Sequence, residues 1–326
     1  MKALVYEGPE TLTYRDAVDP TPKPGEHLVK VEAVGICGSD MHAYLGHDDR
    51  RPAPLILGHE AAGVVVGGPM DGTRVTVNPL VSDPNSPASR AGRENICPRR
   101  ELMSMPPREG AFSQHLAVPE SNLVVVPDAV PLSKAALAEP LAVSWHAVAL
   151  GLRSLHPSME RTALVLGGGA IGVAAVLALH AQGVEDVTIV EPNLTRRAFL
   201  TDTCGFNAVA HATEPSPLVI DAVGYAATRE TASHLAEPGG VIVHVGLGDN
   251  AGGLDIRRMT LQEITFIGAY TYSMQDFRDT AQAIFDGRLG PLDWIETRPL
   301  ADGAEAFAQL RAGQVATPKI VLTPWS

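Results

Sequence analysis

The sequence predicts an α/β protein with two domains: a β-rich domain and a doubly wound parallel sheet. The chain has 326 residues, more than a single compact core usually needs. Short apolar runs between turn residues dominate the first part of the chain, whereas strands and helices alternate from residue 161 onward. An Ala- and Leu-rich stretch that is typical of helix lies between the two patterns.

The β-rich domain is predicted from apolar runs bounded by proline and glycine. We expect strands over residues 2–6, 28–34, 63–66, 74–77 and 123–126. Residues 80–108 have few apolar side chains and many turn formers, so they predict a long and partly irregular lobe. Residues 134–155 predict a helix that is interrupted around Pro140, because proline lacks the backbone donor that a helix interior needs.

The parallel sheet is predicted from the alternation that follows. Strands are expected at 162–166, 187–190, 218–223, 241–245 and 264–269, and helices at 170–182, 194–203 and 226–236. Such alternation gives a parallel sheet covered by helices on both faces. The tail from residue 272 predicts one more helix, a helix over 301–312 and a last strand over 319–322.

Composition limits the partners and the compartment. The chain carries 25 basic and 37 acidic residues, with a formal net charge of −12. An acidic surface repels nucleic acid and anionic lipid, so neither is an expected partner. Three widely spaced cysteines, Cys37, Cys97 and Cys204, argue against a disulfide framework. The charged start of the chain has no apolar signal core, and we expect a cytoplasmic protein.

A glycine-rich turn joins the strand at 162–166 to the next helix. Its pattern is GxGxxG, formed by Gly167, Gly169 and Gly172. The first glycine permits the tight turn, the second lets the backbone approach a pyrophosphate, and the third allows the helix to pack on the strand. Free N–H groups at the helix start attract phosphate, and here they belong to Ala170 and Ile171.

An acidic residue in the right place strengthens this motif. Glu191 ends the next strand, 19 residues after Gly172, where a carboxylate binds the adenosine ribose hydroxyls and disfavours a 2′-phosphate. The motif therefore predicts that the chain binds NAD. The alternative is a glycine-rich turn without a ligand, followed by an exposed glutamate. Arg196 and Arg197 follow, either stacked on the adenine or as solvated helix residues.

Three polar clusters stand in otherwise apolar or turn-like sequence. They supply a thiol, an imidazole and two carboxylates, from Cys37, His59, Glu60 and Glu139. These groups suit a tetrahedral zinc site with an exchangeable position, and a zinc ion there polarises a substrate oxygen. Taken singly, Cys37 is more often a small buried apolar residue, and His59 more often a structural histidine.

Four motifs in this order make the chain resemble one family over almost its whole length. They are GICGSDMH from residue 35, LGHEAAG from 57, AEPLAVSWHA from 138 and VLGGGAIG from 165. The set resembles the zinc-containing medium-chain dehydrogenases, most closely the sorbitol (polyol) and threonine dehydrogenase branch. The resemblance implies a GroES-like catalytic domain, residues 1–141 and 272–326, and a Rossmann NAD-binding domain, residues 142–271. It also implies a homodimer or homotetramer.

The resemblance assigns roles to the polar residues. Cys37 and His59 become zinc ligands. Glu60 either binds the ion directly or supports a ligand, and Glu139 binds the ion directly or through water. Ser39 lies beside the substrate oxygen, and His42 relays its proton through the nicotinamide ribose. The alternatives are helix capping by Ser39 or Asp40 and a surface role for His42. Backbone groups at three strand ends are expected to touch the cofactor, at Val223, Val245 and Ala269.

The sequence departs from the family at several places. Many relatives bind a structural zinc through four cysteines in the lobe, but here only Cys97 remains, beside Asp83, Ser86 and Ser89. We therefore expect no structural zinc. Residues 204–218 are too short for a helix that relatives carry, so the sheet is expected to have one helix fewer. Thr271 replaces an arginine that binds substrate hydroxyls in sorbitol-type enzymes. Three aromatic residues line the pocket or simply pack: Tyr44, Phe112 and Tyr270.

The expected function is NAD-linked oxidation of a secondary hydroxyl on a polyol, with one catalytic zinc. Other substrates remain open: a sugar acid, a phosphorylated polyol, a vicinal diol or threonine. Few basic residues mark the expected pocket, which counts weakly against phosphorylated substrates. A zinc-free quinone reductase would not need Cys37, His59 and Glu139. A catalytically silent NAD-binding sensor is the alternative outside the enzymes.

Overall fold

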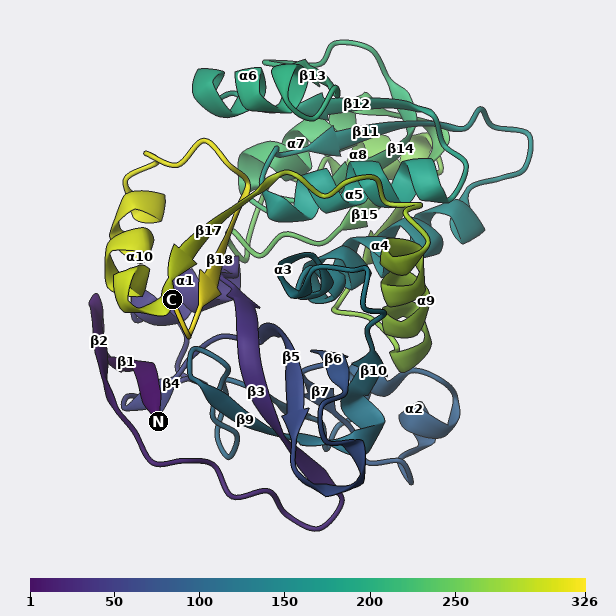
Figure 1. Ribbon diagram of the computed structural model, residues 1–326. Helices are drawn as coiled ribbons and strands as arrows, with labels where there is room; N and C mark the ends of the chain where they lie inside the picture. The colour runs from purple at the N-terminus through teal and green to yellow at the C-terminus, as the bar shows by residue number, and fades with distance from the viewer.

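The computed structural model describes residues 1–326 and divides into a β-rich part and a parallel α/β part (Figure 1). The largest sheet of the β-rich part has seven strands, because β9 (His115–Pro119) also pairs with β3. Its main order is β10 (Leu123–Val125), β6 (Arg74–Val77), β5 (Glu60–Val66), β3 (Glu26–Gly35), β18 (Lys319–Thr323) and β17 (Ile295–Pro299). A three-stranded sheet lies beside it, in the order β2 (Thr11–Asp16), β1 (Lys2–Gly8) and β4 (Leu55–Ile56).

The α/β part is one parallel sheet of six strands. The order is β13 (Asn207–Val209), β12 (Asp186–Val190), β11 (Thr162–Leu166), β14 (Ser216–Asp221), β15 (Ala236–His244) and β16 (Thr265–Gly268). The chain order reverses between β11 and β14, and in open sheets ligands bind outside the carboxyl ends of strands at such a point. The predicted fold class is confirmed.

Helices cover both faces of this sheet. On one face α4 (Ala138–Ser154), α5 (Ala170–Ala181) and α9 (Met274–Phe285) share a core with Ala163 and Val165 of β11. On the other face, α7 (Ala226–Leu235) and α8 (Ile256–Leu261) pack on Leu164 and Leu166. α6 (Leu194–Asp202) packs beside β13, and no helix separates β13 from β14. The expected loss of one helix from the sheet is confirmed.

One apolar stretch, Leu132–Ser154, is long enough to cross a bilayer, but 67% of its most apolar 18-residue window is buried in the protein. It is a core element that comprises α3 (Leu132–Ala135) and α4. The helix breaks at Ala136 and Leu137, not at Pro140 as the sequence predicted. Pro140 lies in the first turn of α4, where its missing N–H has no helical partner to lose.

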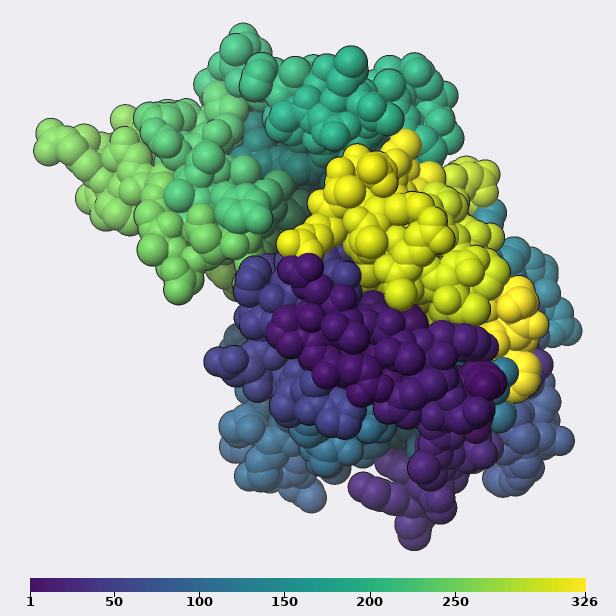
Figure 2. Space-filling view, turned by 90° about the vertical axis from the view of Figure 1, so that its left-hand side faces the viewer, coloured from purple at the N-terminus to yellow at the C-terminus, as the bar shows by residue number.

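The ends of the chain lie together. β18 pairs antiparallel with β3, and α10 (Gly303–Arg311) packs beside β2. Figure 2 shows the C-terminal residues in yellow against the N-terminal residues in purple. The domain limits at 141/142 and 271/272 stay a prediction, and the first of them falls inside the continuous helix α4.

Three strands of five or more residues, β2, β9 and β17, were not predicted from the sequence, nor were four shorter ones. β2 has no buried residue and therefore no apolar alternation. β9 and β17 are short, and proline ends each of them. The lobe at residues 80–108 is as irregular as expected, with only β7 (Leu80–Val81), α2 (Pro87–Arg90) and β8 (Glu101–Leu102) besides a short 3-10 turn.

Candidate metal and dinucleotide site

The register of β3 and β5 brings the predicted ligands together. Gly35 at the end of β3 pairs with Glu60 at the start of β5, so Cys37 and His59 flank the same point. A Cβ at Gly35 would collide with the Glu60 carboxylate, which explains a glycine there. α1 (Gly38–Tyr44) begins directly after Cys37.

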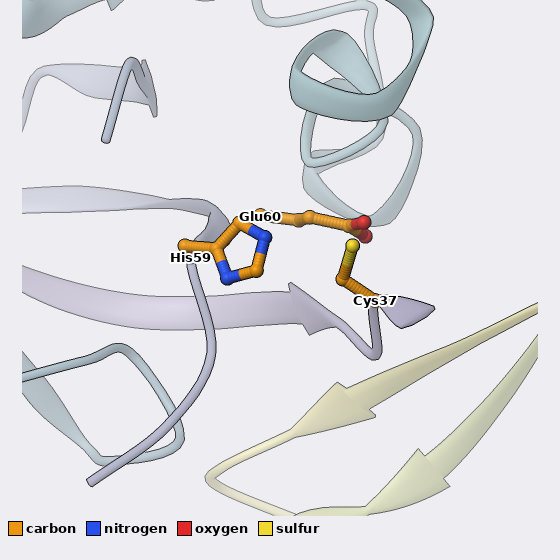
Figure 3. Close-up of side chains that lie close together, drawn as sticks. All are labelled: Cys37, His59 and Glu60. Carbon is orange, nitrogen blue, oxygen red and sulfur yellow. The ribbon is translucent and has the colours of Figure 1, made fainter. Parts of the chain in front are cut away.

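Three ligand atoms converge, as Figure 3 shows. One atom each from Cys37, His59 and Glu60 lies within 4.8 Å of the others, and we call these residues the ligand cluster. His59 and Glu60 are buried and Cys37 is half-buried. A thiolate, an imidazole and a carboxylate at this separation are a donor set typical of zinc.

Asp40 orients His59. Its carboxylate accepts hydrogen bonds from the backbone N–H of Cys37 (3.0 Å) and of Gly58 (3.1 Å), and it lies 3.4 Å from His59 Nδ1. Burial alone would lower the pKa of His59, but Asp40 and Cys37 outweigh it and hold that pKa well above its usual value. The cluster is therefore an anionic environment that favours a cation. The capping role considered for Asp40 is confirmed, but its contact with His59 was missed.

Lys319 is the residue that sequence reasoning missed most completely. Its ammonium donates to both carboxylate oxygens of Glu60, at 2.6 and 2.7 Å, and to the Ile36 carbonyl at 2.8 Å. Both side chains are buried, and although burial opposes it, Glu60 and Cys37 raise the pKa of Lys319. The sequence did contain one indication of a buried ion pair, a single lysine at the start of an apolar strand.

Glu139 lies beside the ligand cluster but not in its 4.8 Å group. It is 6% exposed, and Tyr272 donates its hydroxyl to Glu139 Oε1 at 2.8 Å. Burial raises the pKa of Glu139 to about 7, with His59 opposing and Glu60 adding to the rise. Tyr272 was also missed, because a tyrosine after a strand carries no specific signal.

Ser39 and His42 both lie on α1. The Ser39 hydroxyl is 3.5 Å from His59 Nε2, so it borders the ligand cluster. Arg51, itself 2% exposed, donates to the Ser39 carbonyl at 3.2 Å. His42 is half-buried, and its imidazole makes no hydrogen bond within the chain.

The glycine turn has the form that a dinucleotide cradle needs. Gly167 has a φ of 100°, in the region that favours glycine, and a Cβ on Gly172 would collide with the Gly167 carbonyl. A Cβ on Gly169 would meet no atom within 4 Å, so this backbone faces open space. Ala170 and Ile171 begin α5, as predicted.

Glu191 closes the turn. One carboxylate oxygen accepts from the Gly168 N–H at 3.1 Å and the other from the Asn193 N–H at 2.7 Å. Arg196 donates to the Val315 carbonyl at 2.9 Å, which ties α6 to the C-terminal tail. Arg197 donates to the carbonyls of Glu191 and Pro192.

The other predicted cofactor contacts follow strand ends. Val223, Val245 and Ala269 come after β14, β15 and β16 and are half-buried. Thr271 follows with a φ of 44°, and its buried Oγ1 has no hydrogen-bond partner.

Two of the aromatic candidates do not line a pocket. Tyr44 and Phe112 are 7% and 0% exposed, and both rings pack against Phe307 in the core of the β-rich part. Only Tyr270 keeps a half-exposed ring. Two surface cavities, of about 430 and 310 Å³, include none of the predicted site residues in their walls, so donor chemistry, not cavity size, identifies the site.

The lobe brings together the four positions where relatives have cysteines. We call Asp83, Ser86, Ser89 and Cys97 the lobe cluster. Ser86 Oγ donates to Ser89 Oγ at 2.9 Å and accepts from the Ser89 N–H at 3.0 Å. Hydrogen bonds, the strongest from Ser86, lower the pKa of the buried Cys97 thiol, and Asp83 pairs with Arg99. The polar groups of the lobe cluster therefore find their hydrogen-bond and ion-pair partners within the lobe.

Comparisons with known proteins agree with this geometry. Residues 23–128 match the family model of the alcohol dehydrogenase GroES-like domain, and residues 170–286 match that of the zinc-binding dehydrogenases. The 2-dehydro-3-deoxy-L-galactonate 5-dehydrogenase of Pseudoalteromonas atlantica is 31% identical, with 95% of each chain covered. Sorbitol dehydrogenase 1 of Saccharomyces cerevisiae is 29% identical over 86% of each chain.

A solved structure extends the agreement to three dimensions. An Escherichia coli CFT073 alcohol dehydrogenase, complexed with NADH, superposes with a TM-score of 0.88 over 99% of both chains, at 27% identity. The likeness therefore covers both the β-rich part and the parallel sheet. Together with the two family matches and the 31% identical relative, it shows that this chain belongs to the zinc-dependent medium-chain dehydrogenase family.

Proposed function

We propose that this chain oxidises a secondary hydroxyl of a polyol-like substrate, with one zinc ion at the ligand cluster and NAD as hydride acceptor. The observation that carries the proposal is the ligand cluster itself, a half-buried thiol beside a buried imidazole and a buried carboxylate, with donor atoms within 4.8 Å of one another. The relatives named for sorbitol and for a deoxygalactonate support the substrate class.

The residues present fit a zinc ion. Cys37 and His59 would hold it, and Glu60 or Glu139 would complete the donor set. Zinc bound there lowers the pKa of a coordinated hydroxyl, which is the chemistry that alcohol oxidation needs. Glu60 is held by Lys319 through both oxygens, so its pairing keeps a buried carboxylate next to the ion without an unbalanced charge.

The chain's own residues would then position substrate and move a proton. The Ser39 hydroxyl borders His59 and can accept the proton of the substrate hydroxyl. His42 on the same helix has an unpaired imidazole that can pass this proton to solvent. Tyr272 fixes the buried carboxylate of Glu139 through one oxygen and leaves the other free.

The residues at the strand ends fit a dinucleotide. The open face of Gly169, the N–H groups of Ala170 and Ile171, and Glu191 form a cradle for pyrophosphate and ribose. The carboxylate favours NAD over a 2′-phosphorylated cofactor. Val223, Val245 and Ala269 would border the nicotinamide half, and Thr271, whose buried hydroxyl has no hydrogen-bond partner, follows two residues after Ala269.

An NAD-reduction screen tests the proposal. Purified protein with one zinc per chain is assayed over polyols, sugar acids and diols of three to six carbons, with and without a chelator. We expect NADH formation with at least one class and its loss on chelation. NAD binding without zinc and without turnover over the whole panel would instead support the silent sensor.

We also propose a homo-oligomer, dimer or tetramer, in the cytoplasm. β16 is one of the two edge strands of the parallel sheet, and Leu261 and Ile256 of the adjacent α8 are 66% and 63% exposed. An unpaired edge beside exposed apolar side chains favours association with a second copy. Light scattering of the purified chain tests this, and a monomer at micromolar concentration would contradict it.

A further inference from the structure

One buried arginine next to the ligand cluster has no role in the proposed mechanism. Arg51 follows α1 in the chain and is only 2% exposed. A guanidinium group is seldom buried unless its donors find acceptors, because each unpaired N–H would lose its hydrogen bond to water. The acceptors of Arg51 therefore indicate which groups this arginine holds in place.

All five N–H groups of the guanidinium have an acceptor. Nε donates to the Ser104 carbonyl at 2.9 Å, and Nη1 donates to the Ser39 carbonyl at 3.2 Å and to Asp48 Oδ2 at 2.7 Å. Nη2 donates to the hydroxyls of Ser39 at 3.5 Å and of Ser104 at 3.4 Å. Four of the five contacts thus reach two serines, and they join α1 to the lobe.

The two serines lie at opposite nitrogens of His59. Ser39 Oγ is 3.5 Å from His59 Nε2, and Ser104 Oγ is 3.4 Å from His59 Nδ1. Ser104 is fully buried and has a φ of 66°, a left-handed conformation that is costly for a residue with a side chain. The Nε donation of Arg51 to the Ser104 carbonyl stabilises this turn. Ser104 is therefore a fixed anchor for the arginine, beside the candidate metal ligand.

The contact with Arg51 determines how the Ser39 hydroxyl can act. A hydroxyl has one proton to donate and two lone pairs that accept, whereas a guanidinium only donates. Nη2 of Arg51 therefore occupies one lone pair of Ser39 Oγ, and the serine proton must point away from the arginine. The other lone pair is left to accept a proton from the substrate hydroxyl. Without the arginine the hydroxyl would rotate more freely, and fewer of its orientations would allow the transfer.

Resting on the proposed function, we propose that Arg51 is a positioning residue that holds Ser39 Oγ as the acceptor of the substrate proton. Ser104 and Asp48 in turn hold the arginine. In the transfer, a bond forms between Ser39 Oγ and the substrate proton while the serine O–H bond breaks, and the serine proton leaves to solvent through His42. Ser39 ends as a hydroxyl, Arg51 keeps all its protons, and the hydride passes to NAD.

A double-mutant cycle tests the proposal, with the polyol, sugar acid or diol that is oxidised fastest in the NAD-reduction screen. Arg51→Met should lower kcat about 10- to 100-fold, because hydrogen bonds from a charged donor are lost, and should leave KM within about twofold. Ser39→Ala should lower kcat about a hundredfold or more. Because Arg51 acts through the Ser39 hydroxyl, adding Arg51→Met to Ser39→Ala should lower kcat by at most about threefold more.

Arg50→Met is the matched control. Arg50 donates to the same Asp48 carboxylate, at 2.7 and 2.9 Å, but its side chain is 62% exposed and makes no hydrogen bond to Ser39. Its kcat should stay within about twofold of wild type, as for most surface substitutions. Losses of Arg51→Met and Ser39→Ala that multiply in the double variant would overturn the inference, because a merely structural loss is independent of the hydroxyl.

Arg51→Lys guards against a variant that fails to fold. Lysine keeps a cation that can pair with Asp48, but one ammonium cannot match the fork that reaches both serines and the carboxylate. Its kcat should therefore lie within about threefold of that of Arg51→Met. A lysine variant with the kcat of wild type would mean that charge alone matters, and it would contradict the positioning role.

A measurement without turnover separates this inference from the proposed function. In zinc-free protein labelled with nitrogen-15 arginine, the Arg51 Nε–H signal is the one absent from Arg51→Lys. It should exchange with heavy water about a hundredfold more slowly than that of Arg50, because it is buried and bonded to Ser104. Turnover together with fast exchange at Arg51 overturns this inference alone. No turnover by the wild type over the whole panel overturns the proposed function, and this inference with it.

Discussion

The ligand cluster and the lobe cluster are both sets of polar side chains around one cysteine, but they differ in what these side chains can bind. In the ligand cluster, Cys37 and the carboxylates surround His59 and leave a buried site that favours a cation. In the lobe cluster, two hydroxyls satisfy each other and Cys97, and Arg99 neutralises Asp83. A cysteine at a metal position therefore indicates a metal only where other side chains bring suitable donor atoms within a few ångströms of its thiol.

Cys37→Ser tests the ligand cluster. Of the variants considered, we expect it to have the largest effect, on both zinc content and activity. Losing a thiolate ligand removes the ion and with it several kcal/mol of charge stabilisation, roughly a thousandfold in kcat. Zinc per chain, measured by elemental analysis, should fall from one to near zero. Cys204→Ser, at a half-buried cysteine outside both clusters, is the control. A Cys37→Ser protein that keeps its zinc would show that the ligand set is wrong.

Lys319→Met should destabilise the fold, because it leaves the Glu60 carboxylate buried without its partner. Removing one member of a buried pair costs about 3–5 kcal/mol. Urea unfolding of the metal-free protein measures this loss and keeps ion binding out of the result. Adding Glu60→Gln to Lys319→Met should recover most of it, since the unpaired charge is gone. If the double variant is no more stable than Lys319→Met alone, charge is not the cause.

These two experiments concern residues that the sequence predicted unequally well. The glycine turn and the candidate ligands Cys37, His59 and Glu60 could be predicted because each belongs to a local sequence motif. Lys319, Tyr272 and Arg51 could not, because their roles arise from contacts with residues 259, 133 and 12 positions away. The same applies to the fold: regular strands such as β6 and β11 were predicted to the residue, whereas β2, exposed on both faces, was not.

Cys97→Ala tests the lobe cluster. If the lobe cluster is held only by its own hydrogen bonds, the variant should keep wild-type zinc content and lose about 1–2 kcal/mol of stability, the cost of one buried hydrogen-bonding group. Elemental analysis and urea unfolding give the two numbers. A fall from two zinc ions per chain to one would mean that the lobe binds a metal after all.

Ser86→Ala should have the smallest effect on stability, and this effect should be confined to the lobe. Ser86 caps α2 by accepting from the Ser89 N–H, and losing such a cap costs about 1 kcal/mol. Ser89→Ala is the matched control, since it removes only the hydroxyl contact and leaves the cap. Hydrogen exchange over residues 86–97 should therefore accelerate more in Ser86→Ala than in Ser89→Ala, while exchange near Cys37 stays unchanged. Equal acceleration in both variants would mean that the mutual contact of the hydroxyls, and not the cap, holds the lobe cluster. Faster exchange near Cys37 would mean that the two clusters are coupled, and the contrast between them would then describe one network and not two.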